Sequence, residues 1–255
     1  MLGYPEQGLN HIGQAVALAQ TLQHPPSIAF AYGIGCFAYH SARDVEWVEN
    51  ASAETLKLAE REVFQLWDTI ALIYHGWAIA MKGRIEEGIE EIEKGLEKFR
   101  PTGTRICLPD MMTMLGEALW KAGRIEEALA ALDEGIREAT SPDRNEHFME
   151  PELYRLKAEI FKQCAEIEEH PEHAAKLFKD AEDSFQDALD LSRKQKARML
   201  EIRAAVGLGR LWQKQGKQQE ALQILENLYN SFTEGFATED LREAHILIEE
   251  LKTST

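Results

Sequence analysis

The chain has 255 residues, with 44 acidic and 28 basic side chains and a net charge of −16. Because such a negative charge repels phosphate backbones, general nucleic-acid binding is not expected. A hydrophobic share of 44% is too high for a disordered chain, while the apolar runs are far shorter than the ~18 residues that cross a bilayer, so no membrane partner is expected. Three widely spaced cysteines, Cys36, Cys107 and Cys164, favour reduced thiols and a cytoplasmic location.

A first helix is predicted over residues 6–22, because apolar residues recur there at spacings of three and four and form one stripe. These residues are Leu9, Ile12, Val16 and Ala19. When the chain is aligned on the period of the later repeats, this helix falls at the position of the second helix of a repeat. We therefore expect residues 1–26 to be a half repeat and Met1 to begin a fragment of a longer protein.

A complete repeat is predicted over residues 27–63, after Pro25 and Pro26 end the first helix. Its first helix runs to about Ser41 and its second covers residues 44–62. The second helix matches the later repeats poorly, so this is the weakest repeat of the array.

The two best-matched repeats span residues 64–103 and 104–145 and are similar to each other at a constant offset of 40 residues. Each repeat consists of a helix, a turn that contains Gly83 or Gly123, and a second helix. Glycine readily takes the positive φ of such a turn. Small residues also recur inside the helices, where we expect them to mark the points at which two helices cross closely. These are Gly76, Gly88, Gly95, Gly116, Ala128 and Gly135.

Two further repeats and a terminal helix complete the predicted array. Residues 146–196 form a repeat with an insertion near 165–180, which is interpreted as a lengthened hairpin tip where Pro171 breaks the helix. Residues 197–232 return to the offset of 40, and residues 233–255 hold a helix that would cap the last exposed face. No segment has a convincing strand pattern, so the predicted fold class is all-α.

The repeats resemble the tetratricopeptide repeat. A small residue in the first helix is followed twelve positions later by a second small residue, then by a bulky apolar residue and a third small one. Gly76, Gly88, Ile92 and Gly95 keep this spacing. The resemblance implies a tetratricopeptide-like right-handed α-solenoid of helical hairpins, although the repeat here has about 40 residues where the usual one has about 34.

A closer resemblance covers nearly the whole chain. Four segments are similar to the C-terminal repeat region of bacterial signal-transducing ATPases: GWAIAMKGRIEEGIEEIEKGL, LGEALWKAGRIEEALAALDEGI, ELYRLKAEI and FTEGFATEDLREAHILIEEL. In that family an adenylate or guanylate cyclase domain, or a transcriptional-activator domain, often precedes the ATPase module. The resemblance implies a regulatory or sensing arm that engages a protein partner, a peptide segment or a small-molecule inducer, without cyclase or ATPase chemistry of its own.

A search for reaction chemistry finds no G-x-x-x-x-G-K-[ST] phosphate loop and no G-x-S-x-G nucleophile elbow. His170 and His173, with Cys164 nearby, could be proposed as metal ligands. Their spacing is not the i,i+4 spacing of a helical ligand pair, however, and Pro171 interrupts them. We therefore expect a non-enzymatic chain with no cofactor and no metal.

The first helices of such repeats line a concave groove, and the residue after each small position is expected to point into it. The predicted groove residues are aromatic toward the N-terminus and charged toward the C-terminus. They are Phe37, Tyr74, Trp77, Glu117, Trp120, Arg155, Glu159 and Arg210. An apolar wall with converging charged groups suits a peptide or a polar small molecule. The alternative is that Phe37 and Trp77 belong to the core and that the charged residues pair with one another.

Two functions remain open from the sequence. The first is a protein-binding or ligand-sensing module that uses the groove, in which replacing Arg155 or Arg210 by alanine weakens binding without unfolding the array. The second is a structural self-association module that uses the open face of the first half repeat and has no small-molecule ligand.

Overall fold

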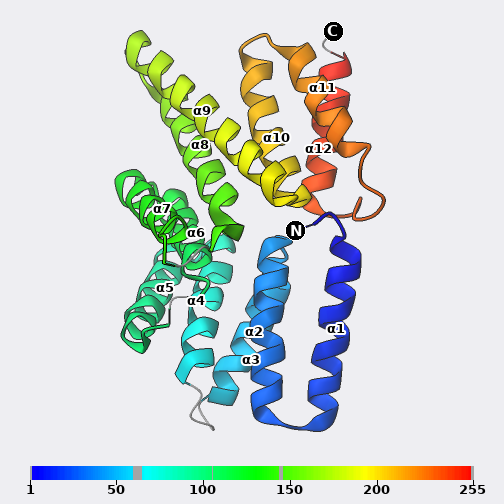
Figure 1. Ribbon diagram of the computed structural model, residues 1–255. Coiled ribbons are helices and arrows are strands. Elements are labelled where there is room, and N and C mark those ends of the chain that lie inside the picture. The colour runs from blue at the N-terminus through cyan, green and yellow to red at the C-terminus, as the bar shows by residue number, and fades with distance from the viewer. Residues whose placement is uncertain (1, 60–64, 105, 144–145, 254–255) are drawn as a thin grey trace. The chain divides into compact units, whose positions relative to one another are not determined.

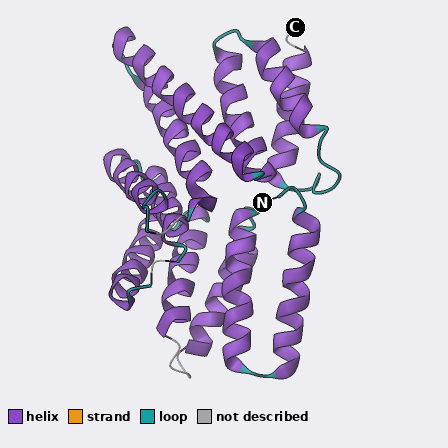
Figure 2. Cartoon of the chain, in the orientation of Figure 1, coloured by secondary structure: helices purple, strands orange, loops and turns teal. Residues whose placement is uncertain are grey.

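The computed structural model describes residues 2–59, 65–104, 106–143 and 146–253. The described residues form twelve α-helices and two short 3-10 segments, and they contain no strand (Figure 1 and Figure 2). They divide into two compact units. The N-terminal unit is residues 6–131, and the C-terminal unit is residues 132–255 together with residues 1–5.

Successive helices of the N-terminal unit run in opposite directions and pack as hairpins, α2 on α3 and α4 on α5 (Figure 1). The first helices of the hairpins also contact one another, α2 on α4 and α4 on α6. The helices of this unit are α1 (Pro5–Leu22), α2 (Pro25–Ser41), α3 (Val45–Ala59), α4 (Gln65–Met81), α5 (Ile85–Phe99), η1 (Arg100–Thr102) and α6 (Leu108–Lys121). Helix α7 (Ile125–Ala139) contributes residues to both units.

The C-terminal unit repeats this arrangement. Helix α8 packs on α9 and α10 on α11, and the terminal helix α12 lies against both α10 and α11. Its core is made of buried Ala, Leu, Ile and Phe side chains from α8 to α12. The elements are η2 (His147–Met149), α8 (Glu150–Ile167), α9 (Pro171–Gln195), α10 (Arg198–Lys214), α11 (Gln218–Tyr229) and α12 (Glu239–Thr253).

Three hairpin turns place a glycine in the left-handed region of the backbone. Gly83, Gly123 and Gly216 have φ values of 99°, 75° and 79°. Forty residues before Gly83, the turn between α2 and α3 places Arg43 in the same region, with φ 63°. An L-residue pays about 1–2 kcal/mol for this conformation, so a compensating interaction of Arg43 is expected.

Small residues mark the helix crossings, as predicted for Gly76 and Gly88. A Cβ atom on Gly76 would lie 2.6 Å from the carbonyl oxygen of Gly88, and a Cβ on Gly88 would overlap the carbonyl oxygen of Gly76. Gly209 likewise faces the second helix of its hairpin, where a Cβ would lie 3.0 Å from Leu225. The recurring small side chains therefore let the two helices of a hairpin approach closely.

The insertion near residues 165–180 lengthens the α8–α9 hairpin. Helix α8 continues to Ile167, and α9 is one uninterrupted helix from Pro171 to Gln195. The break is confined to residues 168–170, because Pro171 occupies the first turn of α9, where its missing N–H has no partner to lose. The surplus residues therefore lengthen two packed helices.

The all-α, tetratricopeptide-like fold of helical hairpins predicted from the sequence is confirmed. The predicted limits of the individual repeats stay a prediction, and the boundaries at residues 63 and 145 lie outside the described residues.

Candidate functional site

In the N-terminal unit, a buried carboxylate joins two helices and a turn. The indole Nε1 of Trp77 donates a hydrogen bond of 2.8 Å to Oε2 of Glu117, and both side chains are buried. Arg43 donates two further bonds to the same carboxylate, Nη1 to Oε2 at 2.8 Å and Nη2 to Oε1 at 2.5 Å. The guanidinium also lies 5.6 Å from the Trp77 ring. A buried carboxylate is costly without such partners, so this group holds α4, α6 and the α2–α3 turn together.

A second polar group lies next to the first. The hydroxyl of Tyr74 donates a 2.7 Å hydrogen bond to Oδ2 of Asp110, and Nδ1 of His40 lies 3.2 Å from Oδ1 of Asp110, without hydrogen-bond alignment. The His40 ring stands edge-on to Trp77, with 4.5 Å between ring centroids. Burial, and then the charge of Asp110, raise the pKa of Tyr74 well above its ordinary value. These contacts bury the sides of α4 and α6 that carry Tyr74, Trp77 and Asp110.

The equivalent face of α2 is open. Phe30 and Ile34 are 57% and 43% exposed, and Phe37 is half-buried. These three residues follow one another at helical spacing, and we call them the α2 stripe. The positions 40 residues later, Ile70, Tyr74 and Trp77, are all buried. The α2 stripe, which includes the predicted groove residue Phe37, is therefore more exposed than the equivalent face of α4.

In the C-terminal unit, six charged side chains of alternating sign form a chain across α8, α10 and α12. We call it the charge chain, and its members in order are Asp240, Arg203, Glu152, Arg155, Glu159 and Lys162. Arg203 makes two bonds of 2.7 Å to Asp240 and lies 3.3 Å from Glu152. Arg155 makes bonds of 3.0 and 2.9 Å to Glu152 and lies 3.8 Å from Glu159.

The charge chain is balanced, with three positive and three negative side chains. Burial opposes the charged form of Arg203, but the carboxylates of Asp240 and Glu152 outweigh that effect and raise the pKa of its guanidinium. The pKa of Arg155 is raised for the same reason, with Glu152 as its main partner. The two guanidinium groups therefore remain charged because neighbouring carboxylates compensate them.

The predicted groove residues separate into two sets. Phe37, Tyr74, Trp77, Glu117 and Trp120 lie in the N-terminal unit, while Arg155, Glu159 and Arg210 lie in the C-terminal unit. Trp77 is in the core and Arg155 pairs with Glu159, as the alternative interpretation expects, whereas Trp120 and Arg210 are half-buried. No ion pair of Arg210 occurs within the described part of the chain. Partner contact by these residues stays a prediction.

Sequence reasoning did not select several residues of these networks, namely His40, Arg43, Asp110, Glu152 and Asp240. A signal was present for one of them. Arg43 occupies the turn position that Gly83 and Gly123 hold 40 and 80 residues later, so a non-glycine residue there invites a search for a partner. The others are charged residues on helices, a pattern that is also typical of solvated faces.

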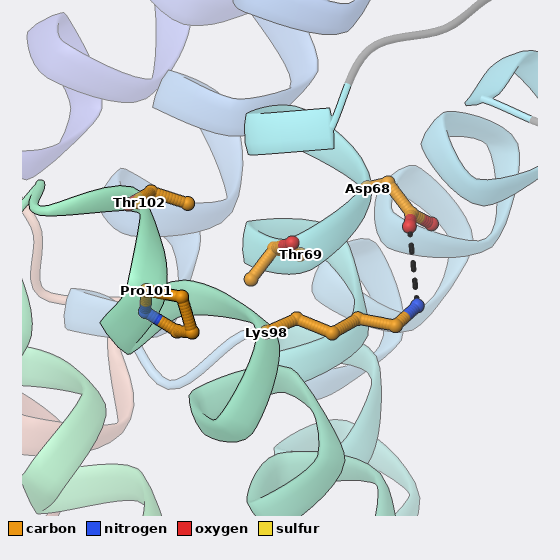
Figure 3. A pocket seen from close by; sticks show the side chains of 5 residues that line it. All are labelled: Asp68, Thr69, Lys98, Pro101 and Thr102. Carbon is orange, nitrogen blue, oxygen red and sulfur yellow. Dashed lines mark hydrogen bonds and ion pairs between the residues drawn. The ribbon is translucent and has the colours of Figure 1, made fainter.

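A cavity of about 470 Å³ lies beside α4 and the end of α5 (Figure 3). It is lined by Asp68, Thr69, Lys98, Pro101 and Thr102. Lys98 reaches Asp68, with 3.4 Å between Nζ and Oδ2, so the two charges compensate each other. None of the predicted groove residues lines this cavity.

Within the described residues, no group of three or more His, Cys, Asp or Glu side chains is placed to hold a metal ion. His170 and His173 have their ring centroids 6.0 Å apart in an edge-on arrangement. In the same part of the chain, no helix combines the length and the apolar character needed to span a membrane.

Comparison with known proteins points to one repeat family. The tetratricopeptide repeat family matches residues 112–134, in α6 and α7, and residues 202–227, in α10 and α11. An uncharacterized protein of Rhizobium meliloti (strain 1021) is 24% identical over 147 residues, which cover 58% of this chain. The chain spans 14% of the length of that relative.

Three solved structures share the fold. BtubC (BKLC) from P. vanneervenii has a TM-score of 0.59 at 14% identity, over 91% of this chain and 94% of that one. A Rap protein complexed with Competence and Sporulation Factor has a TM-score of 0.60 at 9% identity, over 96% and 69%. The Rap conjugation gene regulator of plasmid pLS20, in complex with the Phr* peptide, has a TM-score of 0.55 at 12% identity, over 98% and 71%. The chain therefore has the tetratricopeptide-like helical fold of these proteins.

Proposed function

We propose that this chain is a non-enzymatic protein-interaction module that binds a peptide segment of a partner on the α2 stripe. The observation that carries the proposal is the exposure of Phe30 and Ile34, 57% and 43%, at positions whose equivalents on α4 are buried. Two structures of the same fold were solved with partners named Competence and Sporulation Factor and the Phr* peptide, which supports a peptide as the ligand here.

The energetics favour an apolar anchor in the partner. Burying a fully exposed Phe or Ile side chain is worth about 1.5–3 kcal/mol, and Phe30 and Ile34, which are 57% and 43% exposed, would each contribute about half of that. The helices are already formed, so little conformational entropy is lost on binding. The net charge of −16 further favours a peptide that carries basic residues beside its apolar anchor.

A regulatory role within a longer protein extends this proposal. The resemblance to the repeat region of signal-transducing ATPases, cyclases and transcriptional regulators suggests an arm that reports partner binding to other domains. The match to a relative of which this chain spans only 14% supports a place inside a long protein.

Selection of binding peptides tests the proposal. A phage-displayed random peptide library is selected against the whole chain, and the recovered peptides are titrated by fluorescence anisotropy. The test variant is Phe30→Ser/Ile34→Ser. The control variant is Leu18→Ser/Leu22→Ser, which replaces two apolar residues of α1 that are 62% and 61% exposed.

The proposal expects Phe30→Ser/Ile34→Ser to weaken the recovered peptides by about tenfold or more, because two apolar anchors are lost. The control should bind them as the wild type does. Circular dichroism verifies that both variants remain folded. Equal weakening in the two variants, or a selection that recovers no peptide above background, would exclude the α2 stripe as the binding face.

A second candidate function is self-association through α1. Leu18 and Leu22 lie one helical turn apart on α1 and are both largely exposed, which favours a second copy as their cover. Static light scattering over a concentration series separates the candidates. Self-association predicts a mass that rises with concentration in the wild type and remains monomeric in Leu18→Ser/Leu22→Ser, whereas peptide binding predicts no such change.

A further inference from the structure

We infer that the junction of α9 and α10 holds a binding site for a small organic phosphate. A cavity of about 630 Å³ lies at this junction, within the C-terminal unit. Its lining residues are Leu2, Tyr4, Arg193, Lys196, Arg198 and Glu201. Pockets that hold small molecules have volumes of roughly 300–1,000 Å³, so the cavity has a suitable size.

The cavity carries a surplus of positive charge on an acidic protein. Three of its lining side chains are cationic and one is a carboxylate, which leaves a net charge of 3 − 1 = +2, against −16 for the whole chain. Arg193 is compensated, because its Nε lies 3.0 Å from Glu201 and its Nη1 lies 3.3 Å from Asp190. The surplus therefore belongs to the other two cations.

Of the three cations that line the cavity, Lys196 and Arg198 are the two that pair with no carboxylate of the described residues. Arg198 donates one hydrogen bond of 2.5 Å, from Nη1 to the neutral hydroxyl of Ser231, and its other N–H groups remain for a ligand. Both side chains are exposed, while Ala197 between them is buried. Two positive side chains thus border one cavity, whose lining carboxylate, Glu201, pairs with Arg193 instead.

The backbone holds these two residues in place. Lys196 takes φ 56° at the end of α9, where its N–H bonds back to Arg193, and Ala197 N–H donates a 2.8 Å bond to Ser192. The next residue begins α10, whose N-cap Ala197 contributes no capping side chain. The C-terminus of α9 and the N-terminus of α10 meet here, and their opposite partial charges offset each other, so the positive field comes from the two side chains.

The apolar part of the lining selects the rest of the ligand. Leu2 and Tyr4 are 64% and 56% exposed, and between them Gly3 packs on Arg198, where a Cβ would lie 3.1 Å from the Arg198 Cβ. A phosphate monoester carries about −1.5 to −2 charges at neutral pH, which matches two cations, whereas a carboxylate carries one. An aromatic or aliphatic body on that phosphate would cover Leu2 and Tyr4.

Titration with phenyl phosphate tests this site in the full chain. Binding is measured by isothermal titration calorimetry in low-salt buffer, with inorganic phosphate and benzoate as the two comparison probes. Phenyl phosphate should bind more tightly than either, because only it has both the dianionic head and the ring. The test variant is Lys196→Gln/Arg198→Gln. The control is Lys194→Gln/Arg242→Gln, which removes the same charge from exposed residues outside the cavity.

The inference expects the test variant to weaken phenyl phosphate by about tenfold or more, since charge-assisted hydrogen bonds are lost, and the control by less than about twofold. Thermal unfolding verifies that both variants keep the fold. Equal weakening in both would show a diffuse field of the protein surface and overturn the site. So would the absence of saturation in the wild type at about 10 mM ligand, an affinity too weak for a built pocket. The α2 stripe lies in the other unit, so the two proposals stand or fall separately.

Discussion

Arg43 and Glu117 are 74 residues apart in the sequence, and their side chains are joined by two hydrogen bonds of 2.8 and 2.5 Å. Arg43 stands where Gly83 and Gly123 stand in the next two repeats, and it accepts a φ of 63° there. The strain at this turn is offset by the bond to a buried carboxylate. One residue thus serves as a turn residue and as a link between repeats.

Replacing Arg43 by glycine should lower the free energy of unfolding by about 2 kcal/mol. Removing one partner of a buried ion pair costs about 3–5 kcal/mol, and the release of left-handed strain returns about 1–2 kcal/mol. Urea denaturation measures the difference. The control is Arg84→Gly, which removes an exposed arginine at the next turn that pairs with Glu87. If Arg43→Gly is as stable as the wild type, the pair with Glu117 contributes no more than the left-handed strain that glycine releases.

Alanine substitution should change stability in opposite directions at two helical glycines. One lies at the close crossing of α4 and α5, and the other lies on α1. Gly88→Ala should lower stability by about 1–3 kcal/mol, because the new methyl group overlaps the backbone of Gly76. Gly13→Ala should leave stability unchanged or raise it by up to about 1 kcal/mol, since nothing lies within 4 Å of its Cβ position and alanine favours the helix. Thermal unfolding compares the two variants. A harmless Gly88→Ala would contradict the role of small residues at helix crossings.

The charge chain changes what is expected of Arg155. In the wild type, Glu152 and Glu159 share Arg155 as a neighbouring cation. Because Arg155→Ala removes this cation, it should lower the free energy of unfolding by about 3 kcal/mol or more. Arg210→Ala should have little effect on stability, because Arg210 makes no ion pair with any described residue. Chemical denaturation measures both. Arg210→Ala is therefore the sharper test of ligand binding at the predicted groove, and equal stability losses in the two variants would exclude this account of Arg155.

The three thiols should differ in reactivity. Cys36 is buried, and burial raises the pKa of its thiol well above the ordinary value, so little thiolate forms. Cys107 and Cys164 are partly exposed. Labelling the native chain with a thiol reagent near pH 8 should therefore modify two cysteines quickly and Cys36 only after unfolding. Mass spectrometry of digested protein identifies the slow site, and rapid labelling of Cys36 would show that α2 opens readily.

Glu182 predicts a dependence of stability on acid pH. Burial of its carboxyl group opposes the charge, but hydrogen bonds from Lys217 and Trp212 outweigh it, so its pKa lies below the ordinary value of 4.5. The unfolded state therefore binds the proton first, and the stabilisation is present above pH 4.5 and lost as the pH falls through the folded-state pKa.

The variant Glu182→Gln tests this dependence. It should be less stable than the wild type at neutral pH, and the difference should shrink in acid as the wild type loses the contribution of Glu182. Urea denaturation over a pH series measures it, with Glu220→Gln on α11 as a control at an exposed carboxylate. A stability difference that is constant from neutral to acid pH would show that the charge of Glu182 is not involved.

The helices and turns could be predicted because their signals are local. Gly83 and Gly123 mark turns that need positive φ, and the spacing of Gly76 and Gly88 marks a helix crossing within one hairpin. The insertion near residues 165–180 was harder. Pro171 marks the start of α9, but the sequence does not show how the surplus residues divide between the end of α8 and the beginning of α9.

The candidate site was only partly predictable. Phe37 and Trp77 share one register position, yet one is half-buried and the other has no exposed surface, because exposure depends on which helices cover each face. The bond between Arg203 and Asp240 likewise joins α10 to the terminal helix α12, and no local pattern connects residues 37 positions apart.

The sequence by itself determined a stack of helical hairpins, since periodic apolar and small residues specify helices and their crossings over short distances. Only the tertiary structure decided which charges are neutralised and which stay available. Packing brings Glu117 to Arg43, and it leaves Lys196 and Arg198 at the edge of a cavity, where neither pairs with a carboxylate of the described residues. Charge compensation depends on distances between side chains far apart in the sequence, and folding alone sets those distances.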